Sequence, residues 1–163
     1  MNTIIVYYSL EENTHYVAQK IAENLGADLL RLYPKKAYPN AGFKKFFWGG
    51  KSAMMAEKPA LEPYVFHADE YERVIIGFPV WAGNVAPPLR TFVSENDLSG
   101  KQVSAFACQS GSGAEKAFAK LAAAAGIEKL ENELILIDPK AKPREENENK
   151  IKAFCDKLCV ATQ

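Results

Sequence analysis

The sequence predicts an α/β fold in which a parallel sheet lies between two layers of helices, as a three-layer sandwich. The main observation is that strand and helix patterns alternate about five times along the chain. The run RVIIGF, Arg73–Phe78, is a compact, branched apolar segment typical of a central strand buried on both faces. Gly26 and Gly126 each follow a helical pattern directly, as expected for helix ends.

The first half of the chain begins with a buried strand at Ile4 and a polar turn, Ser9–Thr14. A helix follows, because apolar residues recur there at helical spacing. A short second strand, Asp28–Leu32, comes next, and Arg73–Phe78 is the third. The apolar residues of the first helix are Val17, Ile21 and Leu25.

The second half continues the alternation. Pro87 and Pro88 suit the first turn of a helix that ends near Asn96. The polar stretch Lys140–Asn149 leads into a last helix. Between these two helices we expect a fourth strand at Gln102–Cys108, a helix at Ala114–Ala125 and a fifth strand at Glu133–Ile137. The inward face of the last helix would carry Ile151, Phe154, Cys155, Leu158 and Cys159.

One interval, Tyr33–Asp69, is much longer than a simple crossover requires. Between Tyr33 and Lys58 it holds six lysines and one acidic residue, Glu57, together with a cluster of aromatic residues. We favour a helix with a buried aromatic side and solvated lysines. The alternative is a pocket wall that attracts a dinucleotide phosphate. The aromatic residues are Phe43, Phe46, Phe47 and Trp48.

Length and composition indicate one globular domain, residues 1–163. Apolar residues make up 48% and charged residues 25% of the chain, which are ordinary values for a packed protein. Twenty basic residues balance twenty acidic ones, and a net charge of zero argues against nucleic acid or a membrane surface as the main partner. No signal-peptide pattern or long apolar run is present, so we expect a cytoplasmic protein.

Cysteine and histidine use gives no sign of a metal site. Cys108, Cys155 and Cys159 are odd in number and lack CxxC spacing, which argues against a disulfide framework or a zinc site. Cys155 and Cys159 share one face of the last helix, and we interpret them as small buried apolar residues, with a redox or metal role as the alternative. His15 and His67 are interpreted as solvated surface residues. We predict no metal ligand and no catalytic acid, base or nucleophile.

Three polar or glycine-rich stretches follow the first, third and fourth strands, and the carboxyl ends of parallel strands share one edge of a sheet. The turn Ser9–Thr14 precedes a helix, whose free N–H groups and dipole favour an anion. The stretch Gly77–Asn84 contains Trp81, a candidate platform for a planar ring. The loop Cys108–Gly113 has two glycines, which permit close approach of the backbone.

Each stretch alone also has a simpler interpretation. Asn13 or Thr14 could serve as an ordinary helix cap, Trp81 could close the mouth of the core, and Cys108–Gly113 could be a flexible turn. Together, an anion site, a ring platform and a close-approach loop at one edge indicate a mononucleotide with a flat ring.

At these residues the chain resembles the flavodoxin family. The match covers Ser9, Asn13 and Thr14 of the phosphate loop, GFPVWAGNVAPPLRTFV at 77–93 and FACQSGSG at 106–113. The resemblance is strongest to bacterial flavodoxin-like proteins with a basic aromatic insertion before the third strand. It implies a five-stranded parallel sheet of order 2-1-3-4-5 and noncovalent binding of FMN.

The resemblance also implies which residues would contact FMN. The first loop would hold the phosphate, Trp81 would stack on the flavin ring, and the third loop would line the other edge of the ring. The cofactor-binding residues are expected to be Ser9, Leu10, Glu11, Glu12, Asn13, Thr14, Pro79, Val80, Trp81, Ala82, Gly83, Asn84, Cys108, Gln109, Ser110, Gly111 and Gly113.

Two glutamates depart from the family pattern. Glu11 stands where a threonine is usual, and Glu12 where a glycine is usual. A left-handed backbone at Glu12 would cost on the order of 1 to 2 kcal/mol. A carboxylate about 8 Å from the phosphate would cost roughly 2 kcal/mol at a dielectric constant near 20. We therefore expect FMN to be held less tightly than is usual in the family.

The resemblance favours an electron-transfer protein that carries one or two electrons between redox partner proteins, or to and from a small electron donor or acceptor. We expect a monomer or weak dimer. Two alternatives stay open: an FMN-dependent NAD(P)H or quinone reductase on the same fold, and a binding module without flavin. The chemistry in either redox case would come from the cofactor.

Overall fold

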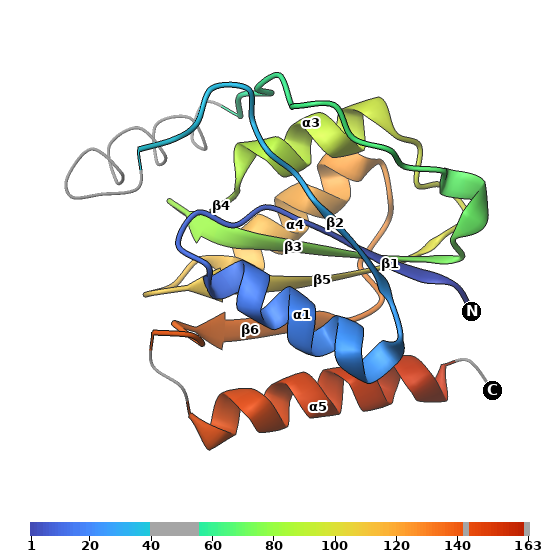
Figure 1. Cartoon of the computed structure of the whole chain (residues 1–163), viewed down its shortest axis with the longest axis vertical. Helices are drawn as coiled ribbons and strands as arrows, with labels where there is room; N and C mark the ends of the chain where they lie inside the picture. The colour runs from blue at the N-terminus through green and yellow to red at the C-terminus, as the bar shows by residue number, and fades with distance from the viewer. Residues whose placement is uncertain (40–55, 142–143, 162–163) are drawn as a thin grey trace.

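Five parallel strands form the centre of the molecule, and the computed structural model describes residues 1–39, 56–141 and 144–161. The order in the sheet is β2-β1-β3-β5-β6, so the predicted order 2-1-3-4-5 is confirmed (Figure 1). A short strand, β4, pairs antiparallel with the end of β3. The strands are β1 (Thr3–Tyr7), β2 (Asp28–Arg31), β3 (Arg73–Trp81), β4 (Asn84–Val85), β5 (Gln102–Gln109) and β6 (Glu133–Ile137).

The strand order reverses between β1 and β3. The chain passes from β1 outward to β2 and returns on the other side of β1 as β3, which places Ile5 beside Leu29 and Ile75. At such a switch point the connections leave the sheet in opposite directions, and a crevice opens outside the carboxyl ends of the two strands. The segments that follow β1 and β3 are therefore the natural walls of a site.

Helices cover both faces of the sheet, as predicted. Figure 1 shows α1 and α5 on one face and α3 and α4 on the other. A short 3-10 turn, η1, precedes β3. The bounds are α1 (Asn13–Leu25), η1 (Ala68–Glu70), α3 (Pro87–Glu95), α4 (Ala114–Ala125) and α5 (Glu145–Val160).

Each face of the sheet has its own apolar core. Ile5, Ile75 and Phe106 pack beneath α1 and α5. Phe78 packs beneath α4 on the other face, where its ring meets that of Phe118 at 5.8 Å between centroids. The strands at the switch point are buried along both faces, which explains their continuous apolar runs.

Two boundaries differ from the prediction by more than one residue. The third strand continues beyond Phe78, because Val80 pairs with Val85 and Trp81 pairs with Asn84 across a tight turn. The stretch after the third strand is therefore a hairpin instead of a loop. The last helix begins at Glu145, inside the polar stretch expected to precede it, and acidic residues occupy its first turn as the helix dipole favours.

The prediction that Cys155 and Cys159 are both buried is wrong for Cys159. Cys108 and Cys155 are buried, but Cys159 is exposed. Leu158 takes the buried position in the last turn of α5, which leaves its neighbour facing outward. No helix among the described residues is both long and apolar enough to cross a bilayer.

The long interval before β3 is described only at its ends. Pro34 and Leu61 form an isolated antiparallel bridge between those ends. Residues 40–55, which carry Phe43, Phe46, Phe47 and Trp48, lie outside the described residues. The predictions made for that aromatic and basic segment remain predictions.

Candidate functional site

A cavity of about 370 Å³ lies at the carboxyl edge of the sheet, beside the switch point between β1 and β3. Segments following three different strands form most of its wall, and one residue after β6 completes it. The lining residues are Ser9, Leu10, Glu11, Asn13, Thr14, Pro79, Val80, Trp81, Ala82, Cys108, Gln109, Ser110, Gly111, Ser112 and Asp138.

The Ser9–Thr14 turn joins β1 to α1 and forms one end of the cavity. The buried Ser9 Oγ accepts a 3.1 Å hydrogen bond from the backbone N–H of His15, and the Glu12 carbonyl accepts the N–H of Tyr16 at 2.9 Å. Within the described residues, the N–H groups of Asn13 and Thr14 have no such partner. Two of the helix N-terminal donors therefore remain for a ligand.

The side chain of Thr14 adds a third donor at the same place. Thr14 is only 1% exposed, and its Oγ1 makes no hydrogen bond of ordinary geometry among the described residues. The thiol of Cys108 interacts with this hydroxyl, but a thiol is a weak hydrogen-bonding group. A buried hydroxyl without a good partner is costly, so this position favours a ligand oxygen.

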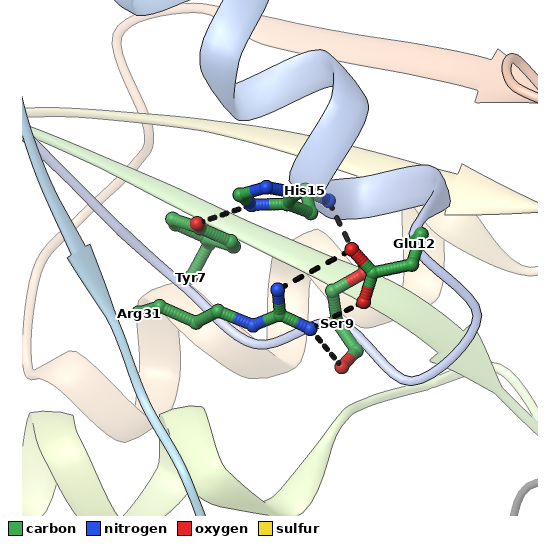
Figure 2. Close-up of polar contacts among 5 residues, drawn as sticks. All are labelled: Tyr7, Ser9, Glu12, His15 and Arg31. Carbon is green, nitrogen blue, oxygen red and sulfur yellow. Dashed lines mark hydrogen bonds and ion pairs between the residues drawn. The ribbon is translucent and has the colours of Figure 1, made fainter.

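Glu12 forms the left-handed corner of the turn. Its φ is 68° and its ψ is −2°. The carboxylate leaves the cavity and pairs with Arg31 at the end of β2, with Nη2 donating to Oε1 at 2.6 Å (Figure 2). The hydrogen bond from Arg31 lowers the pKa of Glu12. Burial alone would lower the pKa of Arg31, but its contacts with Glu12 raise it overall.

His15 is half-buried, and not fully solvated as was expected. Its Nδ1 lies 2.6 Å from the hydroxyl of Tyr7, and the two rings stack with centroids 5.7 Å apart (Figure 2). Burial raises the pKa of Tyr7 to about 12, so the hydroxyl keeps its proton at neutral pH. His67, in contrast, is exposed at the start of η1, as predicted.

The β3–β4 hairpin, Val80–Val85, forms the opposite wall. Trp81 lines the cavity and is partly exposed, and its ring system contacts two tyrosines. The ring centroids of Tyr38 and Tyr8 lie 5.1 Å and 5.8 Å from that of Trp81, both in edge-to-face geometry. These contacts restrict the orientation of Trp81, which still lines the cavity.

Contacts behind the hairpin hold it in place. Asn84 is buried, donates from Nδ2 to the Ala82 carbonyl at 2.7 Å, and accepts a hydrogen bond from Lys120 of α4. Gly113 lies so close that a Cβ there would be 2.8 Å from the Cα of Gly83. Glycine is therefore required at position 113 for two reasons: φ is +107°, and there is no room for a Cβ.

The β5–α4 loop, Ser110–Gly113, completes the third side. Gln109 Oε1 accepts the N–H of Ala114 at 3.1 Å and so caps α4. Ser110 Oγ donates to Asp138 Oδ1 at 2.7 Å. Burial raises the pKa of the Cys108 thiol to about 12, which keeps the thiol neutral beside the cavity.

Asp138 is a cavity residue that sequence reasoning missed. It follows β6 directly, and the backbone N–H of Lys140, two residues later, donates to Asn13 Oδ1 at 2.9 Å. The same rule that pointed to the ends of the other strands also applies to the end of β6. That signal could have identified Asp138.

Most of the residues proposed as cofactor contacts line the cavity, but four of them do not. Glu12 turns away to Arg31, and Asn84 and Gly113 support the hairpin from behind. Gly83 lies in the hairpin turn, against Gly113. Among the described residues, no group of three or more histidine, cysteine or acidic side chains is arranged to hold a metal ion.

Solved structures with the same fold are similar over most of their length. A protein from Bacteroides eggerthii, provisionally assigned as a flavoprotein, has a TM-score of 0.80 and 23% identity, with 97% of this chain and 98% of that chain covered. A flavoprotein in complex with FMN from Lactobacillus acidophilus has a TM-score of 0.71 and 20% identity, with 85% and 93% covered. An apo NADH:FMN oxidoreductase has a TM-score of 0.61 and 11% identity, with 99% and 90% covered.

These identities establish the fold alone. No curated protein sequence matches the chain. The sequence profile of the flavodoxin family, however, matches residues 2–151, which is nearly the whole chain. The chain therefore belongs to the flavodoxin family.

Proposed function

We propose that the cavity binds FMN noncovalently and that the protein uses it to transfer electrons. One observation carries the proposal: among the described residues, the cavity has N–H and hydroxyl donors without good partners at the Ser9–Thr14 turn and the partly exposed Trp81 on another wall. That combination suits a phosphate joined to a planar ring. Membership of the flavodoxin family and the similarity to a flavoprotein in complex with FMN support it.

The donors at the Ser9–Thr14 turn fit a phosphate ester. The N–H groups of Asn13 and Thr14 and the Thr14 hydroxyl all lack good partners within the described chain. The Ser9 hydroxyl accepts from His15 but still has its own hydrogen to donate. The positive end of the α1 dipole adds to the attraction.

The remaining walls fit a flat ring. Trp81 presents an apolar surface, and the β5–α4 loop offers backbone groups on the other side of the cavity. Bound FMN would supply one- and two-electron redox chemistry. The residues of this chain would hold the phosphate, orient the ring and keep water from part of it.

The pairing of Glu12 with Arg31 alters the expected FMN affinity. Glu12 does adopt the left-handed conformation, with φ at 68°, so the expected conformational cost applies. The electrostatic cost is smaller than expected, since Arg31 offsets the Glu12 carboxylate at 2.6 Å. We therefore propose that this protein binds FMN more weakly than is usual in the family. The weakening should be smaller than the sequence alone suggested.

Electron carriage between redox partner proteins is the function we favour over a reductase. Similarity to an NADH:FMN oxidoreductase at 11% identity supports the same fold and does not separate the two. Stopped-flow mixing of flavin-loaded protein with NADPH and with NADH separates them. Slow or absent loss of the visible flavin absorbance supports the carrier, whereas rapid loss without a second protein supports the reductase.

Thr14→Val tests the phosphate end. Removing the hydroxyl should weaken FMN binding about tenfold, while riboflavin, which lacks the phosphate, should bind almost unchanged. The ligand-free variant should be as stable as the wild type or more stable, because a buried hydroxyl without a good partner is removed. Isothermal titration with both flavins and thermal unfolding measure these effects.

Thr91→Val is the matched control. Thr91 is also buried, but its hydroxyl donates to the Pro59 carbonyl at 2.7 Å, away from the cavity. Its loss should lower the free energy of unfolding by about 1 kcal/mol and leave FMN binding unchanged. Equal losses for FMN and riboflavin in Thr14→Val, or no loss for either, would remove Thr14 from the phosphate site.

A further inference from the structure

The side chain of Arg31 contacts two residues of the Ser9–Thr14 turn, Ser9 and Glu12. Its Nη2 donates to the Ser9 carbonyl at 3.2 Å and to Glu12 Oε1 at 2.6 Å, while Nη1 reaches Glu12 Oε2 at 3.4 Å (Figure 2). One guanidinium therefore holds the residue that opens the turn and the residue at its left-handed corner. Arg31 reaches this position because it pairs with Tyr7 in the β1–β2 register.

Among the described residues, the side-chain hydrogen bonds of the corner come from Arg31, and His15 and Lys140 act on the Glu12 carboxylate only through weaker electrostatic contacts. Glu12 has φ 68° and makes no side-chain cap to the helix. A left-handed backbone suits glycine and disfavours glutamate, because the Cβ approaches the following carbonyl. The corner is therefore maintained by surrounding contacts, chiefly the two hydrogen bonds that the Glu12 carboxylate accepts from Arg31.

Both residues held by Arg31 also close the first turn of α1. Ser9 Oγ accepts the N–H of His15 at 3.1 Å, and the Glu12 carbonyl accepts the N–H of Tyr16 at 2.9 Å. A shift of Ser9 or Glu12 would thus change which N–H groups of the helix remain available. Arg31 contacts both of these residues without lining the cavity itself.

The charges around the pair favour a fixed arrangement. The side chain of Arg31 is 20% exposed and that of Glu12 is 40% exposed, and the guanidinium lies 5.3 Å from the ring centroid of Tyr33. A planar guanidinium that makes two bonds to one carboxylate restricts orientation more than a lysine ammonium would. Lysine at this position would keep the charge and lose the double contact.

We propose that Arg31 is a positioning residue for the Ser9–Thr14 turn, holding Glu12 in a conformation that glycine would adopt unaided. The consequence is that Asn13 and Thr14 keep their donors available to a phosphate ester. The identity of that ligand rests on the proposed function. Arg31 and the identity of residue 12 are therefore coupled. With glycine at position 12, the loss of Arg31 should have a much smaller effect.

The first test uses ligand-free protein and does not depend on flavin. Hydrogen exchange of the His15 and Tyr16 amides is measured by NMR in wild type, Arg31→Met, Glu12→Gly and the double variant. Arg31→Met alone should speed both exchanges about tenfold, as expected for loss of a charge-assisted contact. In the Glu12→Gly background, Arg31→Met should speed exchange of these two amides by about threefold or less.

Lys150→Met is the control. It removes one positive charge and an exposed ion pair with Glu146 on α5, so net charge changes as in Arg31→Met. Exchange at His15 and Tyr16 should be unchanged in this variant. Arg31→Lys should restore only part of the protection, because it returns the charge without the planar double contact. Equal acceleration in both position-12 backgrounds would overturn the proposal.

The second test measures flavin affinity. Arg31→Met should weaken FMN binding about tenfold and riboflavin binding less than about twofold, and Glu12→Gly should reduce the FMN loss to about threefold or less. A tenfold FMN loss that persists in the Glu12→Gly background would instead make Arg31 a direct phosphate ligand. Wild type that binds neither flavin would reject the proposed function, and the exchange data would still decide the role of Arg31.

Discussion

Two walls of the cavity, the Ser9–Thr14 turn and the β3–β4 hairpin, each contain a left-handed residue that is not glycine, but different forces hold them. Glu12, in the Ser9–Thr14 turn, has φ 68°, and Ala82, in the β3–β4 hairpin, has φ 51°. Glu12 is held by an ion pair with Arg31 from a separate strand. Ala82 is held by strand pairing on either side and by Asn84 Nδ2, which donates to its carbonyl.

This difference separates a wall maintained by charge from one maintained by backbone pairing and packing. The strand pairing within the hairpin joins residues that are near in the sequence, and it uses backbone groups, which do not titrate at ordinary pH. The contact at the turn joins residues 12 and 31, and it requires an ionised carboxylate. We infer that the ring wall keeps its shape over a wide range of pH, whereas the phosphate wall depends on pH and on salt.

The largest expected effect comes from crowding the hairpin. In Gly113→Ala the new Cβ would lie 2.8 Å from the Cα of Gly83, at a φ of +107° that alanine rarely adopts. The free energy of unfolding should fall by about 2 to 3 kcal/mol. Gly111→Ala is the control, because no atom lies within 4 Å of a Cβ there. Urea unfolding of both variants compares them, and equal losses would contradict the role given to Gly113.

A smaller effect is expected from the ring platform. Trp81→Ala should weaken FMN binding by at least about 1 kcal/mol, the amount that aromatic stacking adds beyond buried area. Trp81→Phe should lose less, since a flat ring remains. Fluorescence titration with FMN measures both variants, and unchanged affinity in Trp81→Ala would remove Trp81 from the site.

The fold was predictable because its signals are local. Apolar strands and amphipathic helices alternate along the chain, and the helix Ala114–Ala125 and the strand Glu133–Ile137 have the predicted bounds. The extension of β3 was missed, although Ala82-Gly83 between two pairing residues is a two-residue hairpin turn. That turn was recognisable, because its chemistry lies in adjacent residues.

The candidate cavity was predictable in outline but not in its long-range contacts. The rule that ligands lie beyond the carboxyl ends of parallel strands located the three main walls. The pairing of Glu12 with Arg31 depends on the register between β1 and β2, which residue patterns do not specify. The contact between Tyr7 and His15 depends on how α1 docks on β1, so His15 was misplaced at the surface.

The smallest expected effect tests the charge dependence of the turn. Arg31 lowers the pKa of Glu12 from its model-peptide value of 4.5, so the folded state favours the ionised carboxylate. The stabilisation is therefore present above about pH 4.5 and is lost as the pH falls through the lower, folded-state pKa. Because the pair is partly exposed, the loss should be less than about 1 kcal/mol.

Glu12→Gln measures the loss of stabilisation at the Ser9–Thr14 turn, and Gly113→Ala provides the comparison at the β3–β4 hairpin. The difference in unfolding free energy between wild type and Glu12→Gln should shrink as the pH is lowered from neutral, since only the wild type titrates at position 12. The difference between wild type and Gly113→Ala should stay constant over the same range, because packing against Gly83 involves no proton. A Glu12→Gln difference that does not change with pH would mean that shape, and not charge, holds the Ser9–Thr14 turn.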